Sequence, residues 1–322
     1  MSVYTSIENH QLEDFLSHYN LGHLVDYQGI NAGIENTNYF VTTSTGEFVL
    51  TLFEQFSINY DELPYFLELM AYLAEHDIPS AHPLADKEGH YLRQLKAKPA
   101  ALVQRLRGKE VEIPTLAQCH AVGKVLGRLH VISPHFPHHR ANGRGPHWWK
   151  TTAERVLPCL KAEDAYLLQA ELHFQASYQH SDLPRGVIHA DLFRDNTLFE
   201  GNTLCGVIDF YYACNDVLLY DVAVTVNDWC TLPNGYLDEQ RFDAIFESYC
   251  ENRPLTSLEF ETWTVMLRAA ALRFWLSRLQ DLHFPRPGEI THTKNPDVFR
   301  NILQARIDTQ EEHILSLKKY RQ

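Results

Sequence analysis

Short segments of strand-like pattern open the chain. Residues 38–52 consist of a weakly alternating stretch, a turn-rich Thr-Thr-Ser-Thr-Gly segment and the apolar-rich run Glu-Phe-Val-Leu-Thr-Leu, a pattern that predicts a β-hairpin. From Leu63 to Ala74 the apolar residues recur at helical spacing, which predicts a helix. A second strand pair is predicted within residues 91–103. The first third of the chain is therefore expected to be a small β-rich unit with one helix.

Helical spacing dominates the rest of the chain. Apolar residues from Leu116 to Leu129 predict a helix, and residues 258–282 predict a long, largely apolar one. Between these segments, residues 133–146 contain histidines, glycines and prolines and are expected to form a surface loop. We therefore expect an α+β protein with domains at residues 1–106 and 107–322.

Composition and charge narrow the possible partners. The 28 lysines and arginines are outnumbered by 41 aspartates and glutamates, which gives a net charge of −13. This charge disfavours nucleic acid or an anionic membrane surface as a partner, so an anionic ligand would have to be held by a few placed groups. The six cysteines show no C-x-x-C spacing, and no run of eighteen apolar residues occurs. A soluble, cytoplasmic protein with free thiols is expected.

One stretch carries a recognisable chemistry. Val187-Ile188-His189-Ala190-Asp191 begins it, Asn196 follows, and after a Gly-Asn turn a further strand ends in Ile208-Asp209-Phe210. Polar residues that leave such short apolar strands are expected at the rim of the strand pair, where a ligand can reach them. The pattern H-x-D-x-x-x-x-N followed by D-F supplies what phosphoryl transfer from ATP requires. Asp191 would be the base, Asn196 and Asp209 the Mg²⁺ ligands, and His189 would brace the loop.

The same stretch resembles the catalytic and metal loops of the protein-kinase-like fold, in its small-molecule branch. More narrowly, segments spread over most of the chain resemble the bacterial homoserine kinases of the aminoglycoside-phosphotransferase-like type. These segments are Gly33-Ile34-Glu35-Asn36-Thr37-Asn38-Tyr39-Phe40, Val49-Leu50-Thr51-Leu52-Phe53-Glu54, Leu63-Pro64-Tyr65-Phe66-Leu67, His189-Ala190-Asp191-Leu192-Phe193 and Ile208-Asp209-Phe210-Tyr211-Tyr212-Ala213-Cys214-Asn215-Asp216.

The resemblance implies a two-lobed fold, with a small antiparallel sheet in the first lobe and a mainly helical second lobe. It also implies ATP-dependent phosphorylation of the L-homoserine hydroxyl to O-phospho-L-homoserine, a step of threonine biosynthesis, with ATP and Mg²⁺ bound. Such a protein would be a monomer or a homodimer that binds a small molecule and neither nucleic acid nor membrane. Kinases place a phosphate-binding lysine on the hairpin strand, whereas Thr51 holds that position here. Magnesium or another basic residue would have to compensate.

Residues near the nucleotide can be assigned, each with a structural alternative. In the loop before the hairpin, Gly33 would give backbone access to phosphate, and Asn36 or Asn38 would contact phosphate or substrate; an ordinary turn is the alternative. Gln104 and Leu106 lie where the two domains join, so their backbone could contact the adenine edge, or they could be a plain connector.

Residues near the acceptor are assigned in the same way. Three residues that follow Asp209, the predicted Mg²⁺ ligand, could face the amino group of the substrate: Tyr211, Asn215 and Asp216. Arg273 could clamp a carboxylate, although a salt bridge to a neighbouring acid is the favoured alternative for Arg273 and for Arg268 on the same helix.

Other acceptors and another class of protein stay open. Choline, methylthioribose or an aminoglycoside could be the acceptor, and Arg273 would distinguish these from homoserine, because only homoserine has a carboxylate. Without the usual lysine, the chain could also be a catalytically weak nucleotide-binding regulator. The complete set of Asp191, Asn196 and Asp209 argues against that. Asp221 is expected to cap a helix and to hydrogen-bond to the catalytic loop.

Overall fold

The described part of the chain forms two compact units in the computed structural model. One unit runs to Lys109 and also takes in Leu198–Glu200 and Cys205–Tyr211, and the other comprises the rest. The structure describes residues 4–30, 36–54, 59–178, 182–285, 294–310 and 317–320.

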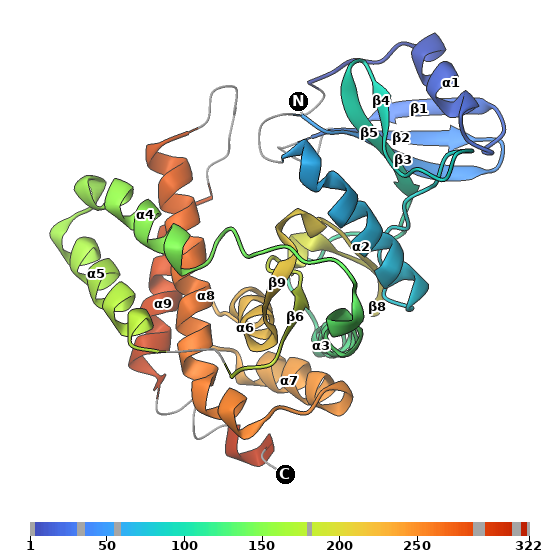
Figure 1. Cartoon of the computed structure of the whole chain (residues 1–322). Helices are drawn as coiled ribbons and strands as arrows, with labels where there is room; N and C mark the ends of the chain where they lie inside the picture. Colours follow the sequence, from blue (N-terminus) through green and yellow to red (C-terminus); the bar gives the residue numbers. More distant parts are fainter. Residues whose placement is uncertain are drawn as a thin grey trace. The chain divides into compact units, whose positions relative to one another are not determined.

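A five-stranded antiparallel sheet is the centre of the first unit (Figure 1). Its strands are β1 (Leu24–Gly29), β2 (Thr37–Thr43), β3 (Gly46–Leu52), β4 (Arg93–Leu95) and β5 (Lys98–Gln104), in the order β1-β2-β3-β5-β4. The predicted hairpin is confirmed as β2 and β3. The second predicted pair is confirmed as β4 and β5, although β4 begins at Arg93 rather than at residue 91. Strand β1 was not predicted: none of its residues is buried, and its alternation is interrupted at Val25 and Asp26.

Two helices cover opposite faces of this sheet because its side chains alternate in direction. On one face, α1 (Asn9–Ser17) buries Leu12, Phe15 and Leu16 against Leu50 and Leu52. On the other face, α2 (Leu63–Glu75) packs its apolar residues around Phe53 and Ala101. The helix predicted from Leu63 is confirmed, and it ends at Glu75.

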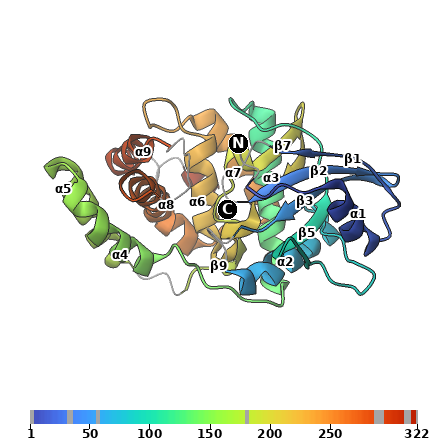
Figure 2. The ribbon, with the colours of Figure 1, turned by 90° about the horizontal axis from the view of Figure 1, so that it is seen from above.

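The second unit is mainly helical (Figure 1). Its helices are α3 (Leu116–Ile132), α4 (Pro146–Val156), α5 (Ala162–Ala176), α6 (Leu218–Trp229), α7 (Glu239–Asn252), α8 (Ser257–His283) and α9 (Asp297–Asp308). The two helices predicted from periodicity are confirmed as α3 and α8, and α8 is buried along most of its length. Helix α3 packs on α7, while α8 contacts α4, α5, α6 and α9. Figure 2 shows α8 and α9 side by side.

Four short strands lie near the motif found in the sequence. β6 (Arg185–Ile188) pairs antiparallel with β9 (Cys214–Val217), and β7 (Thr197–Glu200) pairs with β8 (Thr203–Val207). The loop between β6 and β7 contains His189, Asp191 and Asn196, and Asp209 follows β8. The strand–loop–hairpin order predicted from the sequence is confirmed, whereas β9 was not predicted.

Packing of α3 on α7 depends on a glycine. A Cβ atom placed on Gly123 would lie 2.2 Å from the carbonyl oxygen of Ile245 and 2.2 Å from Oγ of Ser248. Alanine at this position would improve helix propensity by about 1 kcal/mol, but the clash with backbone of α7 cannot be relieved by a rotamer change.

We therefore expect Gly123→Ala to lower the free energy of unfolding by about 1–3 kcal/mol, as overpacked cores do. Urea denaturation followed by circular dichroism measures this change. Gly143→Ala is the matched control, because a Cβ atom there meets nothing within 4 Å. Equal stability of the two variants would contradict the close approach of α3 and α7.

Candidate active site

The loop that follows β6 brings Asp191 and Asn196 together. Val187 and Ile188 of β6 are buried, and the chain then turns through a short 3-10 helix, Arg194–Asn196. Nδ2 of Asn196 donates to the main-chain oxygen of Asp191 at 2.8 Å and to its carboxylate Oδ2 at 3.1 Å. Both donations come from the amide nitrogen, so Oδ1 of Asn196 is the side-chain atom that can meet a cation.

The backbone just before Asp191 has an unusual conformation. Ala190 has a φ of 63°, in the left-handed region that non-glycine residues rarely occupy. Two hydrogen bonds of 2.7 Å maintain it: the N–H groups of His189 and Ala190 donate to Oδ2 and Oδ1 of Asp221. The Nδ1 atom of His189 accepts the N–H of Asp191 at 3.3 Å. These contacts are the ones through which His189 would brace the loop, and that role stays a prediction.

Asp221 is fully buried near the start of α6. Oδ2 also accepts a 3.1 Å hydrogen bond from Nε2 of His130 on α3, and Nδ1 of His130 contacts the Tyr249 hydroxyl of α7 at 2.9 Å. Burial alone would raise the pKa of Asp221, but the hydrogen bonds and charge around it hold that pKa below its usual value. Burial lowers the pKa of His130. We therefore describe the pair as a carboxylate that accepts a hydrogen bond from a neutral imidazole.

The expected contact between Asp221 and the catalytic loop is confirmed, but the expected cap is wrong. Val217 is the N-cap of α6, and its side chain makes no capping hydrogen bond. Asp221 lies within the helix, and its carboxylate accepts the loop N–H groups instead.

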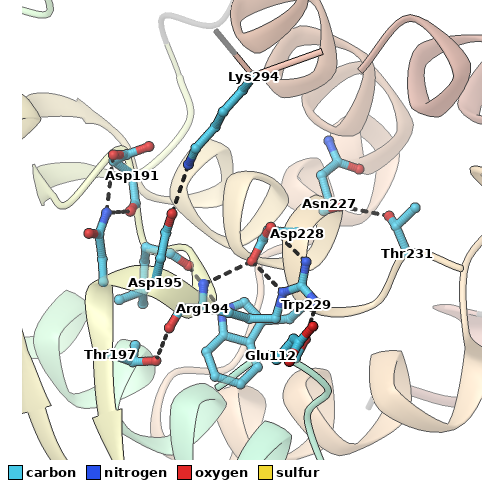
Figure 3. Close-up of polar contacts among 12 residues, drawn as sticks. Glu112, Asp191, Arg194, Asp195, Thr197, Asn227, Asp228, Trp229, Thr231 and Lys294 are labelled. Carbon is cyan, nitrogen blue, oxygen red and sulfur yellow. Dashed lines mark hydrogen bonds and ion pairs between the residues drawn. The ribbon is translucent and has the colours of Figure 1, made fainter. Parts of the chain in front are cut away.

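Charged residues that the sequence analysis did not select fasten the other end of the loop (Figure 3). Nε of Arg194 donates to Asp228 of α6 at 3.0 Å, and its Nη1 donates to the carbonyl oxygen of Glu112 at 2.7 Å. Nζ of Lys294 forms a 2.7 Å ion pair with Asp195. These partners are 34, 82 and 99 positions apart in the chain, so no local pattern could have revealed them.

A further arginine lies within electrostatic reach of the loop. Burial lowers the pKa of Arg278 on α8, while the negative charges of Asp228, Asp195 and Asp191 oppose that effect. Its guanidinium lies 4.5 Å from the ring centre of Phe299 and donates to the carbonyl oxygen of Asn295. In a protein with a net charge of −13, Arg278 and Lys294 place positive charge beside the loop that carries Asp191.

Asn215 and Asp216, which were predicted to contact the acceptor substrate, lie on β9. Both side chains form hydrogen bonds with other groups of the protein. Oδ1 of Asn215 accepts the N–H of Arg140 at 2.9 Å. The Asp216 carboxylate accepts Nδ2 of Asn142 at 2.6 Å and Nη2 of Arg185 at 2.7 Å. The loop of residues 133–146 is largely exposed, as predicted, but these bonds fasten it to β9. Substrate contact by Asn215 and Asp216 stays a prediction.

The two arginines of α8 differ in their surroundings. Arg268 forms the expected salt bridge, at 2.5 Å, with the buried Glu171 of α5. Arg273 is also buried, yet among the described residues no acid pairs with it. Its guanidinium carbon lies 3.8 Å from the ring centre of Phe274 and 4.9 Å from that of Tyr212. The salt-bridge alternative therefore holds for Arg268 and finds no partner for Arg273 in this part of the chain.

In the first unit, Asn38 and Thr51 are neighbours on paired strands. Oγ1 of Thr51 donates to Oδ1 of Asn38 at 2.7 Å, on the sheet face that carries Ala101 and α2. Oδ1 of Asn36 accepts the N–H of Glu54 at 3.2 Å. Gly33, the remaining member of the predicted phosphate loop, lies outside the described residues.

A lysine lies near these strands but on the opposite face of the sheet. Lys98 pairs with Glu54 and donates to Oγ1 of Thr5 at 2.6 Å. Glu54 also accepts Oγ1 of Thr37 at 2.7 Å, and Thr37 is paired with Leu52 on the face covered by α1. Because Thr51 points to the other face, Lys98 does not replace the missing phosphate-binding lysine.

The remaining predicted residues of the first unit have defined places. The backbone N–H of Gln104 donates to the carbonyl oxygen of His82, and the half-buried Leu106 lies against Gly206. The ring of Tyr211 makes edge contacts with Phe53 and Phe66. Contact of Gln104 and Leu106 with adenine, and of Tyr211 with substrate, therefore stay predictions.

The predicted metal acid Asp209 also belongs to the first unit. It is exposed and has a φ of 62°, so it shares the rare left-handed conformation with Ala190. Strain of this kind gathers at functional sites, which supports a role for Asp209, but metal binding stays a prediction.

One group of side chains in the first unit has metal-ligand types at short spacing. Asp86, Glu88 and His90 lie together beside a cavity of about 350 Å³. However, Asp86 already accepts the N–H groups of Glu88 and His90 and Nη1 of Arg93. These bonds hold the pKa of Asp86 at about 2, and they explain the cluster as a structural turn.

The chain is similar to known phosphotransferases. Residues 26–255 match the profile of the phosphotransferase enzyme family. A homoserine kinase of Methylobacillus flagellatus is 49% identical over 97% of both chains. A homoserine kinase of Methylobacillus glycogenes is 48% identical over 97% of this chain and 98% of the relative.

Among solved structures, an amicoumacin kinase in complex with AMP-PNP, Ca²⁺ and amicoumacin is similar in fold. The two chains superpose with a TM-score of 0.69 at 14% identity, over 95% of this chain and 94% of that one. The α+β, protein-kinase-like fold predicted from the sequence is thereby confirmed.

The Asp221 carboxylate gives a prediction for stability and its pH dependence. In Asp221→Asn one oxygen becomes an NH₂ group, which would face a backbone N–H that now donates to the carboxylate. We expect the free energy of unfolding at pH 7 to fall by about 2–3 kcal/mol. Because the Asp221 pKa is lower in the folded protein, the loss is complete above the unfolded pKa of about 3.9 and shrinks as the pH falls toward the folded pKa.

Urea denaturation of wild type and variant between pH 3 and pH 8 measures this difference. Asp26→Asn, the same chemical change at an exposed position of β1, is the control and should shift stability by less than about 0.5 kcal/mol. A difference between wild type and Asp221→Asn that grows on acidification would contradict the assignment of Asp221 as a carboxylate.

Proposed function

We infer that the protein phosphorylates the side-chain hydroxyl of L-homoserine with ATP, because the chain belongs to the phosphotransferase enzyme family and, within it, to the homoserine kinases. The product is O-phospho-L-homoserine, on the route to threonine. The observation that carries this inference is 49% identity over 97% of both chains. The enzyme class predicted from the sequence, an ATP-dependent kinase with an alcohol acceptor, is the class of these relatives.

Asp191 is proposed as the base of this reaction. Two hydrogen bonds from Asn196 orient it, and His189 holds its main-chain N–H. A carboxylate fixed in this way can accept the proton of the attacking hydroxyl while the hydroxyl oxygen bonds to the γ-phosphorus of ATP. The bond between that phosphorus and the β,γ-bridging oxygen breaks, and ADP leaves. The N–H groups of His189 and Ala190 donate to the Asp221 carboxylate, and these bonds set the conformation of the loop before any substrate binds.

Asn196 and Asp209 are proposed to hold a divalent cation, Mg²⁺. The donor set fits, because an amide oxygen and a carboxylate are hard ligands, and the amide of Asn196 is oriented with Oδ1 available. When bound, the cation neutralises charge on the phosphates. Asp209 contributes an exposed carboxylate from a constrained backbone.

The nucleotide is proposed to contact the β2–β3 hairpin and the segment after β5. Asn38, oriented by Thr51, offers its amide at the position where a lysine is usual. Gly33 and Asn36 would complete the phosphate loop, and Gln104 and Leu106 would contact adenine.

The acceptor is proposed to bind in the second unit near Arg273. A buried guanidinium without an acid partner in the described chain suits the carboxylate of homoserine. Tyr211, Asn215 and Asp216 are proposed for the side of the amino group. Choline and the aminoglycosides have no carboxylate that could bind to Arg273.

The oligomeric state, monomer or homodimer, stays a prediction.

The part of the chain that the structure describes contains no helix with the length and apolar character needed to span a membrane.

Removal of the base tests the mechanism. Asp191→Asn should bind ATP as wild type does and lose about 10²–10⁴-fold in kcat, because the amide cannot accept the proton. A coupled ADP-release assay with Mg²⁺ measures turnover, and calorimetry measures ATP binding. Asp195→Asn in the same loop is the control, and the loss of its exposed ion pair should lower kcat by less than about tenfold. Equal losses in both variants would contradict a specific role for Asp191.

The acceptor is tested in the same assay with L-homoserine, choline, methylthioribose, L-serine and kanamycin. We expect turnover selective for L-homoserine. Turnover of another acceptor would keep the mechanism and remove the homoserine assignment. No turnover with any acceptor, together with tight ATP binding, would favour the nucleotide-binding regulator.

The Thr51 hydroxyl gives a test on the nucleotide side. Thr51→Val removes the donor that orients Asn38, so the KM for ATP should rise about 3- to 10-fold, equivalent to about 1 kcal/mol. Thr51→Ser keeps the hydroxyl and should restore the KM. Thr42→Val, on the same face of the sheet, should leave it unchanged. An unchanged KM in Thr51→Val would remove Asn38 and Thr51 from the nucleotide site.

A further inference from the structure

Two arginines from distant parts of the chain meet at one tyrosine ring. The guanidinium carbon of Arg273 lies 4.9 Å from the ring centre of Tyr212, and that of Arg144 lies 5.7 Å from the same centre. Arg144 also lies 4.6 Å from the ring of Trp148. All four residues belong to the second unit. Flat guanidinium groups stack on aromatic faces and keep their N–H donors at the edge, where they can bind an anion.

Arg273 differs from the other buried arginines of this unit in its partners. Arg268 is neutralised by Glu171, and Arg306 donates to Asn227, Thr231 and the carbonyl oxygen of Gly235. Arg273 has aromatic rings around it, and among the described residues no acid forms an ion pair with it. Burial of an arginine is unfavourable unless its charge and donors are matched. An anionic ligand would supply the match.

Hydrogen bonds hold the loop segment that carries Arg144. Its own N–H donates to Oδ1 of Asn142 at 2.7 Å, and Nδ2 of Asn142 donates to Asp216 of β9 at 2.6 Å. Two residues before Asn142, the N–H of Arg140 donates to the side chain of Asn215, the neighbour of Asp216 on β9. The exposed loop is therefore fixed to β9 on both sides of Ala141, and this attachment sets where Arg144 leaves the backbone.

A negative group lies in the same region. The charges of Arg273 and Asp216 both act on the buried Tyr220 and Cys214, Arg273 lowering and Asp216 raising their pKa values, so both charges lie close to this pair. The region thus contains positive charge from Arg144 and Arg273 and the Asp216 carboxylate, which Arg185 also contacts. Charges of both signs are what a zwitterionic amino acid requires.

We propose that Arg144 and Arg273 together bind the α-carboxylate of the acceptor at the edge of the Tyr212 ring, and that Arg144 thereby selects amino-acid acceptors over amino alcohols. This inference rests on the proposed function and names two residues of its acceptor site, Arg144 and Tyr212, that the motifs did not reveal. Two arginines can give a carboxylate more hydrogen-bond donors than one.

The test compares Arg144→Gln with wild type on three acceptors: L-homoserine, its carboxamide L-homoserinamide, and 3-aminopropan-1-ol, which lacks the carboxyl group. Kinetic constants come from the ADP-release assay. For L-homoserine we expect kcat/KM to fall about 10- to 100-fold, mainly through KM. For the carboxamide and the amino alcohol, kcat/KM should stay within about twofold of wild type, because neither molecule has a carboxylate that Arg144 could bind.

Two further variants separate charge from folding. Arg144→Lys keeps the charge and should recover part of the lost kcat/KM on homoserine. Arg155→Gln removes an exposed arginine of α4 that lies 4.7 Å from the Phe284 ring, and it should leave all three acceptors unchanged. Circular dichroism and the melting temperature confirm that each variant is folded.

The outcomes distinguish the inference from the function on which it rests. Equal losses on homoserine and homoserinamide would mean that Arg144 has only a structural role, and an unchanged kcat/KM on homoserine would remove it from the site. In both cases wild type still phosphorylates homoserine, so the proposed function survives. Wild type that is inactive on homoserine but active on 3-aminopropan-1-ol overturns both.

Discussion

The catalytic loop depends on one buried carboxylate. Asp221 has no contact with solvent, and its oxygens accept the N–H groups of His189 and Ala190 and the imidazole of His130. Without these bonds the left-handed φ of Ala190 would relax, because a non-glycine residue pays about 1–3 kcal/mol for such a conformation. The position of Asp191 one residue later follows from that backbone. The conformation of the loop at Asp191 is therefore set by a buried residue of α6.

The carboxylate itself depends on the packing of three helices. His130 comes from α3, Asp221 from α6 and Tyr249 from α7. The Tyr249 hydroxyl accepts Nη1 of Arg253, and Arg253 forms an ion pair with Glu259 of α8. A chain of hydrogen bonds thus runs from the helical core to the loop, and each member polarises the next. Helix packing and loop geometry are consequently one structural unit.

Sequence alone predicted the parts of the fold and site that depend on local pattern. The β2–β3 hairpin, α3 and α8 follow from periodicity, and the contact between Asp191 and Asn196 follows from their spacing within one loop. Long-range pairings carried no local signal. Arg194 with Asp228, Lys294 with Asp195, and Arg144 with Tyr212 join segments whose spacing has no periodicity. The motif indicated Tyr211, yet its ring packs on Phe53, whereas Tyr212 meets the arginines.

The lack of a lysine at Thr51 is easier to understand from the distribution of charge. The lysine of this part of the sheet, Lys98, is committed to Glu54 on the face covered by α1. On the other face Thr51 and Asn38 bond to each other, which leaves a neutral pair where a cation is usual. In the second unit, by contrast, Lys294 and Arg278 lie beside the loop of Asp191, although the whole chain is strongly acidic. Positive charge therefore lies beside the loop of Asp191 within the second unit, whereas the Thr51–Asn38 pair of the first unit carries none.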